Sequence, residues 1–147
     1  MSVLRFQPIS GKAREILKAI LQTPEVSSCA IKDLMLIRLA CEELVMNITS
    51  YAYPEDVEGF LEVDVEKTDE RIVIRFKDGG MPFNPLEHKK PDTKLPWKQR
   101  RIGGLGIFLV KKKMDDVRYA YEDNKNVLTI ELKIISPYTF GGFSRNA

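Results

Sequence analysis

The amino-acid sequence predicts an α+β fold in which helices lie on one face of a largely antiparallel sheet. Two observations predict this class. Apolar residues recur at helical spacing in residues 10–22 and 31–53, and a proline follows each segment. In residues 61–76 and 117–134, apolar and polar residues alternate in pairs of short runs, the pattern of antiparallel hairpins.

Length and composition indicate a single domain over residues 1–147. The 23 basic and 21 acidic residues give a net charge of +2, which does not favour direct nucleic-acid or membrane partners. Because we find no secretory leader and no apolar run of membrane-spanning length, we expect a cytoplasmic location. Cys29 and Cys41 lack metal-ligand spacing, so both are expected to be reduced thiols.

The N-terminal half is predicted to contain an edge strand and two helices. A short strand at 3–6 precedes Ser10, which is placed to cap a helix that ends near residue 22. Thr23-Pro24 ends this helix, and a short polar connection follows. The second helix begins near residue 31 and must end before Pro54, since the residue before a proline disfavours helical geometry.

The C-terminal half is predicted to contain two hairpins. Strands at 61–65 and 72–76 form the first hairpin. Strands at 117–121 and 128–134 form the second, with a turn over residues 123–126 between them. A helix over 107–114 connects the two hairpins.

The helix over residues 31–53 carries polar residues away from its solvated face. Arg38 and Glu42 form an i,i+4 pair of opposite charge on that face. Glu43 and Asn47 fall outside it and are expected to be recessed. Burying such groups unpaired costs about 1–3 kcal/mol or more. A bound metal or ligand would supply partners, and the alternative is a structural Glu-Asn pair bonded to nearby backbone. The apolar stripe facing the core consists of Leu34, Ile37, Cys41, Leu44, Val45 and Ile48.

Two glycine-containing motifs are candidates for ligand contacts. Asp78 ends a predicted strand before Gly79 and Gly80, so a planar ligand could approach the backbone, and the carboxylate suits the exocyclic amine of adenine. The alternative is an ordinary Asp-Gly turn. The run GGLG at 103–106 opens a helix, where backbone N–H groups form an anion site. Tight helix packing is the alternative there.

No periodicity appears between the two glycine motifs, and loops of this length are usually functional or disordered. Six basic residues at 89, 90, 94, 98, 100 and 101 outnumber the acids there, so the segment could fold over phosphates as a lid. A solvated surface loop is the alternative. His88 is interpreted as an ordinary exposed residue, and Trp97 as either a lid anchor or a partner contact.

The order of the motifs resembles a known superfamily. Glu43-x-x-x-Asn47, Asp78-x-Gly80 and Gly104-x-Gly106 follow one another as do the N-box and two glycine boxes of the gyrase, heat-shock chaperone and histidine-kinase ATPases. EELVMNITSYAY, FKDGGMPFNPLE and GGLGIFLVKKKMDDV look like bacterial anti-sigma-factor serine kinases in particular. The resemblance implies a Bergerat-type two-layer sandwich with a mixed, largely antiparallel sheet, a lid at about 84–103 and a separate C-terminal tail at 137–147.

The resemblance also implies roles for individual residues. Asn47 matches the amide that ligates Mg²⁺, and Glu43 matches the carboxylate that polarises a substrate hydroxyl. On the adenine side, the family's threonine corresponds to Thr129 or Asn126. Ile48 and Tyr51 depart from the Ala and His that are usual in the small kinases. The implied nucleotide contacts are Asn47, Asp78, Gly80, Arg101 (or Arg100), Gly103, Gly104, Leu105, Gly106 and Thr129.

The implied activity is that of an ATP- and Mg²⁺-dependent serine/threonine kinase. It would bind a sigma factor or equivalent regulator and phosphorylate an anti-sigma-factor antagonist, in a partner-switching system. The alternative is a catalytically inactive nucleotide-binding module that sequesters the regulator. The catalytic piece of a histidine kinase is disfavoured because no second helical domain is present and His88 lies in the lid. Relatives commonly form homodimers, and the sequence leaves that state open.

Overall fold

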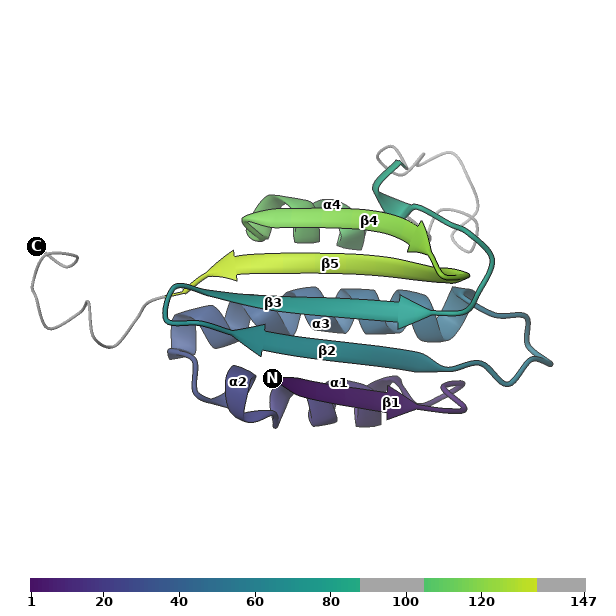
Figure 1. The fold of residues 1–147 in the computed structure, drawn as a ribbon, viewed down its shortest axis with the longest axis horizontal. Coiled ribbons are helices and arrows are strands. Elements are labelled where there is room, and N and C mark those ends of the chain that lie inside the picture. The colour runs from purple at the N-terminus through teal and green to yellow at the C-terminus, as the bar shows by residue number, and fades with distance from the viewer. Residues whose placement is uncertain (88–104, 135–147) are drawn as a thin grey trace, which may run out of the picture.

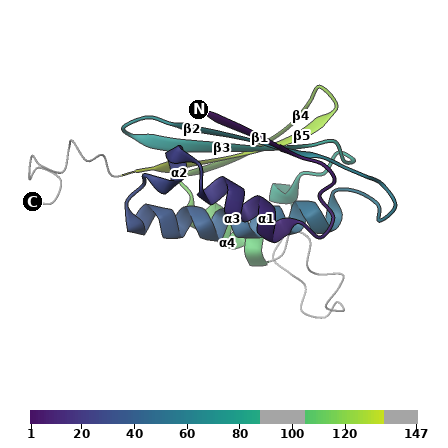
Figure 2. The same cartoon turned by 90° about the horizontal axis from the view of Figure 1, so that it is seen from below.

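The computed structural model describes residues 1–87 and 105–134. In these ranges five strands form one sheet with the order β1-β2-β3-β5-β4. Helices lie on one face of this sheet, so the α+β two-layer prediction is confirmed (Figure 1, Figure 2). No helix within the described ranges is both long enough and apolar enough to cross a bilayer.

All neighbouring strands in the sheet are antiparallel. Both predicted hairpins are present, whereas no parallel pair occurs among the described strands, so the sheet is not mixed there. The strands are β1 Ser2–Phe6, β2 Leu61–Lys67, β3 Arg71–Asp78, β4 Asp116–Glu122 and β5 Lys125–Lys133.

The turn between β4 and β5 is tighter than the sequence predicted. Only Asp123 and Asn124 form it, with φ values of 54° and 61°, the left-handed conformation of a two-residue hairpin turn. Aspartate and asparagine tolerate this conformation better than most residues. The return strand therefore begins at Lys125 and includes Asn126, which the sequence pattern had assigned to the turn.

The predicted helices are present, with two corrections at the N-terminus. The first helix begins after Lys12 and has no side-chain cap, because Gly11, at φ 71°, forms a turn that separates Ser10 from it. A short helix then replaces the predicted polar connection, because Thr23 caps it and proline is favourable at its first position. The helices are α1 Ala13–Leu21, α2 Pro24–Ser27, α3 Ile31–Tyr51 and α4 Leu105–Lys113, with a 3₁₀ turn, η1, at Pro85–Glu87.

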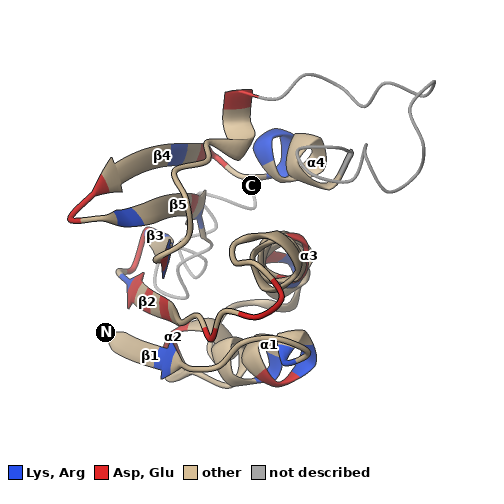
Figure 3. Cartoon of the chain, turned by 90° about the vertical axis from the view of Figure 1, so that its right-hand side faces the viewer, with Lys and Arg blue, Asp and Glu red and all other residues tan. Residues whose placement is uncertain are grey.

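The core lies between α3 and the strands β2, β3 and β5. Figure 3 shows α1, α3 and α4 side by side in one layer and the sheet in the other. Alternate residues of the strands face the helices, which is why Val63, Ile74 and Phe76 are at most 1% exposed. Full burial of each such side chain stabilises the fold by about 1.5–3 kcal/mol.

The opposite face of the sheet is charged. Ion pairs join neighbouring strands there, such as Lys77 with Asp64 at 2.9 Å and Arg71 with Glu131 at 2.7 Å. Solvent-exposed ion pairs contribute about 0–1 kcal/mol each, and Asp64, at 8% exposure, is more buried than such pairs usually are. One face of the sheet therefore packs on helices, and the other faces outward.

Candidate functional site

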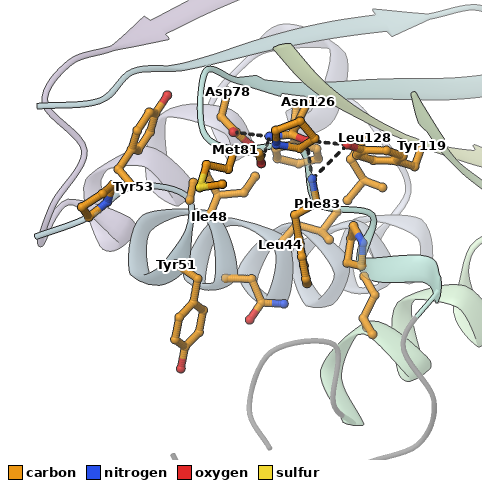
Figure 4. Close-up of a pocket in the computed structure, with 17 residues that line it drawn as sticks. Leu44, Ile48, Tyr51, Tyr53, Asp78, Met81, Phe83, Tyr119, Asn126 and Leu128 are labelled. Carbon is orange, nitrogen blue, oxygen red and sulfur yellow. Dashed lines mark hydrogen bonds between the residues drawn. The ribbon is translucent and has the colours of Figure 1, made fainter. Parts of the chain in front are cut away.

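A cavity of about 400 Å³ opens between the C-terminal half of α3, the ends of β3 and β5, and the segment 81–85 (Figure 4). Its volume falls within the range of about 300–1,000 Å³ that is usual for small-molecule sites. Most of the wall is apolar. The polar side chains at the wall are Asn47, Tyr51, Tyr53, Asp78, Tyr119 and Asn126.

Helix α3 presents Asn47 to the cavity between apolar neighbours. Asn47 and Glu43 are both half-buried, whereas Arg38 and Glu42 are exposed, as the helical pattern predicted. Asn47 lines the cavity; Glu43, one turn earlier, does not. Asn47 and Glu43 therefore lie in different places: Asn47 lies at the cavity wall and Glu43 lies outside it.

Glu43 lies against the first described turn of α4. A Cβ atom added at Gly106 would overlap Oε1 of Glu43, so the absence of a side chain at this glycine permits the contact. A carboxylate near the N-terminus of a helix is stabilised by the helix dipole. The close packing proposed as an alternative for this glycine is therefore real, and it brings two of the sequence motifs together.

Asp78 is 6% exposed at the end of β3. Its Oδ1 accepts hydrogen bonds from the N–H of Gly80 and from Nδ2 of Asn126, both at 2.9 Å. Burial raises the pKa of Asp78, and these two hydrogen bonds act in the opposite direction. The site thus holds a desolvated carboxylate that lines an apolar cavity.

The glycines after Asp78 leave room for protein atoms. A Cβ at Gly80 would overlap the carbonyl oxygen of Ala52, and one at Gly79 would lie 2.8 Å from the Phe60 ring. The expectation that these glycines admit a planar ligand is therefore corrected. They allow the β3 end to approach the end of α3, and this approach positions Asp78.

On β5 the structure selects Asn126 over Thr129. Asn126 pairs with Asp78 and lines the cavity. Thr129 pairs with Arg75 and lies on the opposite, charged face, because residues three apart on a strand point to opposite sides. The expected Thr129 contact is corrected on this ground. Extending the apolar series 132, 130, 128 backwards would have identified Asn126.

Two tyrosines complete the site and were not identified from the sequence. The hydroxyl of Tyr53 accepts hydrogen bonds from the N–H groups of Gly79 at 2.7 Å and Phe60 at 3.1 Å, and donates to the Phe60 carbonyl at 2.6 Å. Tyr119 donates to Oδ1 of Asn126. Burial raises the pKa of both phenols, so both act as neutral hydroxyls. Tyr53 is the last residue of the EELVMNITSYAY stretch, where no role was assigned to it, and none of the motifs includes Tyr119.

Ile48 and Tyr51, the two departures from the small-kinase pattern, both line the cavity. Figure 4 shows Tyr51 directed away from the hydrogen-bonded group formed by Asp78 and Asn126. These substitutions therefore alter the wall of the cavity and leave that group intact.

Part of the predicted site lies outside the described residues. This applies to Arg100, Arg101, Gly103, Gly104, His88, Trp97, the lid from residue 88 onward and the tail at 137–147. Leu105 is the first residue of α4, and its side chain is not described. Within the described ranges, no group of three or more His, Cys, Asp or Glu side chains is arranged to hold a metal.

Comparison with known proteins agrees with this arrangement. Residues 10–132 match the family described as the histidine kinase-like ATPase domain. Serine-protein kinase RsbW of Listeria monocytogenes serovar 1/2a is 31% identical over 104 residues, which cover 67% of this chain and 64% of that protein. The protein of the same name from Bacillus mycoides is 30% identical over 108 residues, with the same coverage. The chain thus spans 64% of the length of these relatives.

Proposed function

Because this chain belongs to the histidine kinase-like ATPase domain family, we propose that it binds ATP with Mg²⁺ and transfers phosphate to a serine or threonine of a protein. The observation that supports this most strongly is the convergence of Asn47, Asp78 and Asn126 on one cavity of about 400 Å³. These residues come from three different elements. Asn47 and Asp78, which belong to two of the motifs, are 31 residues apart in the sequence.

The adenine would lie in the apolar part of the cavity. Asp78 accepts a hydrogen bond from the exocyclic amine, and Leu44, Phe76 and Leu128 pack against the base. Desolvation by these side chains strengthens the hydrogen bond, because competition from water is reduced. Gly80 belongs to this end through its N–H, which holds the Asp78 carboxylate.

The phosphates would lie toward α4. The donor set fits a magnesium ion bound with the nucleotide, since Asn47 offers one neutral oxygen and Mg²⁺ usually completes its shell with phosphate oxygens and water. When bound, the ion neutralises charge on the phosphates. Arg101, Gly103, Gly104, Leu105 and Gly106 are proposed as phosphate contacts.

Glu43 is proposed as the catalytic carboxylate. It lies one turn from Asn47 on α3 and against the backbone of Gly106 on α4. A carboxylate at the junction of the two helices can accept the proton of a serine or threonine hydroxyl as that oxygen approaches the terminal phosphate.

The proposed protein substrate is an anti-sigma-factor antagonist, and the proposed second partner is a sigma factor or equivalent regulator. The similar proteins carry the name serine-protein kinase. The resemblance of the three motifs supports the antagonist as substrate and the sigma factor as second partner. A homodimer is part of this proposal. Nucleotide would change the relative affinity for the two partners, which requires different contacts in each bound state.

Isothermal titration calorimetry with ADP and ATP, with and without Mg²⁺, tests nucleotide binding. We expect saturable binding that Mg²⁺ strengthens, and no binding at millimolar nucleotide would overturn the proposal. Mass spectrometry of the antagonist after incubation with ATP and Mg²⁺ tests transfer. An antagonist without added phosphate, despite nucleotide binding, would favour the sequestering module.

A further inference from the structure

The side chain of Asn126 lies at the centre of a hydrogen-bonded group beside the cavity and is 7% exposed. Its Nδ2 lies 2.9 Å from Oδ1 of Asp78, 3.0 Å from the carbonyl oxygen of Met81 and 3.3 Å from that of Gly80. An amide nitrogen carries two hydrogens, so these three acceptors share both of them. The donor side of the amide is fully used.

The acceptor side of the same amide is also occupied. Oδ1 of Asn126 accepts a hydrogen bond from the N–H of Phe83 at 3.0 Å and another from the hydroxyl of Tyr119. Reversing the amide would place its oxygen against three acceptors and its NH₂ group against the N–H of Phe83, while the Tyr119 hydroxyl already accepts a hydrogen bond from that N–H. The surroundings therefore permit one orientation, with the NH₂ group directed at Asp78 (Figure 4).

This fixed amide makes the two oxygens of Asp78 different. Oδ1 receives the NH₂ group of Asn126 and the N–H of Gly80. Among the described residues, neither of these donors reaches Oδ2 within hydrogen-bond distance, and Asp78 lines the cavity. The protein thus uses one oxygen internally and offers the other as an acceptor to a ligand.

We propose that Asn126 is a positioning residue that makes the site select 6-amino purines over 6-oxo purines. The inference rests on the proposed nucleotide function. An amino group at position 6 of the purine donates to Oδ2, whereas an oxo group there would place two acceptors against each other. Leaving both unpaired in a desolvated cavity lowers affinity by about 10- to 100-fold.

Asn126 enforces the selection because its NH₂ group fixes the orientation of the Asp78 carboxylate. Without the amide donor, only the N–H of Gly80 holds Oδ1, so the carboxyl group is freer to rotate or to hold a proton on either oxygen and donate it to an oxo group. A leucine at position 126 has a similar size and provides no donor. Asn126→Leu is therefore expected to reduce the preference for the amino purine while keeping the shape of the cavity wall.

The experiment measures dissociation constants for ADP and inosine diphosphate, which differ in the substituent at position 6 and the adjacent ring hydrogen. Calorimetry on the full chain with Mg²⁺ gives the ratio of the two constants for each variant. We expect a ratio of about 10–100 for the wild-type chain and a ratio at least about tenfold smaller for Asn126→Leu. A residue that merely supported the fold would weaken both nucleotides alike and leave the ratio unchanged.

Two further variants keep the test decisive if Asn126→Leu fails to fold. Tyr119→Phe removes one hydrogen bond that fixes the amide, and should reduce the ratio by about two- to tenfold. Thr129→Val is the matched control on the same strand, because Thr129 is equally buried but lies on the charged face. Its ratio should equal that of the wild type.

The outcomes separate this inference from the nucleotide proposal. A folded Asn126→Leu or Tyr119→Phe variant that keeps the full ratio overturns the role of Asn126. Equal wild-type binding of the two nucleotides also overturns it, while nucleotide binding itself stands. A wild-type chain that binds neither nucleotide overturns the proposed function and the selection with it.

Discussion

At the scale of single residues, the site holds two carboxylates in different environments. Asp78 is buried beside an apolar cavity and fixed by two hydrogen bonds on one oxygen. Glu43 is half-buried and packs on the backbone of α4. Environments this different fit two separate tasks, recognition by Asp78 and proton transfer by Glu43.

Glu43→Gln should remove phosphate transfer and leave nucleotide binding in place. The amide keeps the size of the side chain and its contact with Gly106 but cannot accept a proton, and loss of a general base costs about 10²- to 10⁴-fold in rate. Phosphorylation of the antagonist would be followed by mass spectrometry, and ADP binding by calorimetry.

Glu42→Gln is the matched control, because Glu42 is the adjacent acid on α3 and is exposed. It should transfer phosphate at the wild-type rate. A Glu43→Gln variant that also transfers at that rate would exclude Glu43 as the base.

Asp78→Asn should increase stability at neutral pH. Burial raises the pKa of Asp78 above its ordinary value of 3.8, so ionising this carboxyl costs the folded state more than the unfolded state. The resulting loss of stability begins as the pH rises through the pKa of this carboxyl in the unfolded chain, and it is complete above its pKa in the folded chain. The asparagine oxygen can still accept from Gly80 and Asn126.

Urea unfolding of the wild-type chain and Asp78→Asn from pH 3 to pH 7 would measure this effect. The advantage of the variant should be largest at neutral pH and should shrink as the pH falls below the folded pKa toward 3.8. A difference that grows on acidification would show that ionised Asp78 stabilises the fold. The variant should bind ADP more weakly, since the acceptor that faces the ligand becomes an NH₂ group.

At the scale of elements, the sequence predicted every strand and every α-helix except α2 among the described residues. Thr23-Pro24 was interpreted only as the end of α1, but the same pair also begins a helix. The hydroxyl of Thr23, at 5% exposure, donates to the Ile20 carbonyl at 2.8 Å and accepts from the N–H of Val26 at 3.4 Å. One side chain thus joins the end of α1 to the start of α2.

Thr23→Val should therefore lower the free energy of unfolding by about 1–2 kcal/mol. Valine keeps the shape of threonine but leaves the Val26 N–H without its cap. Urea denaturation would measure the change, with Ser28→Ala as the control because its hydroxyl is exposed and its two hydrogen bonds, to the Glu25 carbonyl and from Nζ of Lys67, lie at the surface. An unchanged midpoint for Thr23→Val would mean that water replaces the cap without cost.

The fold was more predictable than the site because the two depend on different information. Alternation in β3 and β5 is local, so the strands and their buried faces could be predicted from residue types alone. The pairing of Asp78 with Asn126 depends on the register between β3 and β5, two strands that no short turn connects. The candidate site residues on α3 and β3 were identified through their motifs. Tyr119 belongs to no motif, and Tyr53 ends the first stretch without an assigned role, so the contacts of both tyrosines are visible only when distant segments meet.

At the scale of the whole molecule, the cavity is lined by elements that are distant from one another in the sequence. Its wall comes from α3, α4, β3, β4, β5 and the segments 52–54 and 81–85, so a ligand in it bridges both hairpins and the central helix. A ligand that binds only the folded state adds RT ln(1 + [L]/Kd) to the free energy of unfolding. Occupation of this one cavity should therefore stabilise the whole fold.

ADP with Mg²⁺ at 100 times its dissociation constant should raise the free energy of unfolding by about 2.7 kcal/mol. Chemical denaturation of the wild-type chain at a series of ADP concentrations would measure the rise, which should follow the logarithm of concentration. Glu43→Gln should show the same rise, because its change lies outside the cavity wall. Asp78→Asn should show a smaller rise at the same ADP concentration, because it alters the acceptor for the adenine. A wild-type midpoint that stays constant from zero to millimolar ADP would mean that nucleotide does not bind the folded chain, and would contradict the assignment of the cavity.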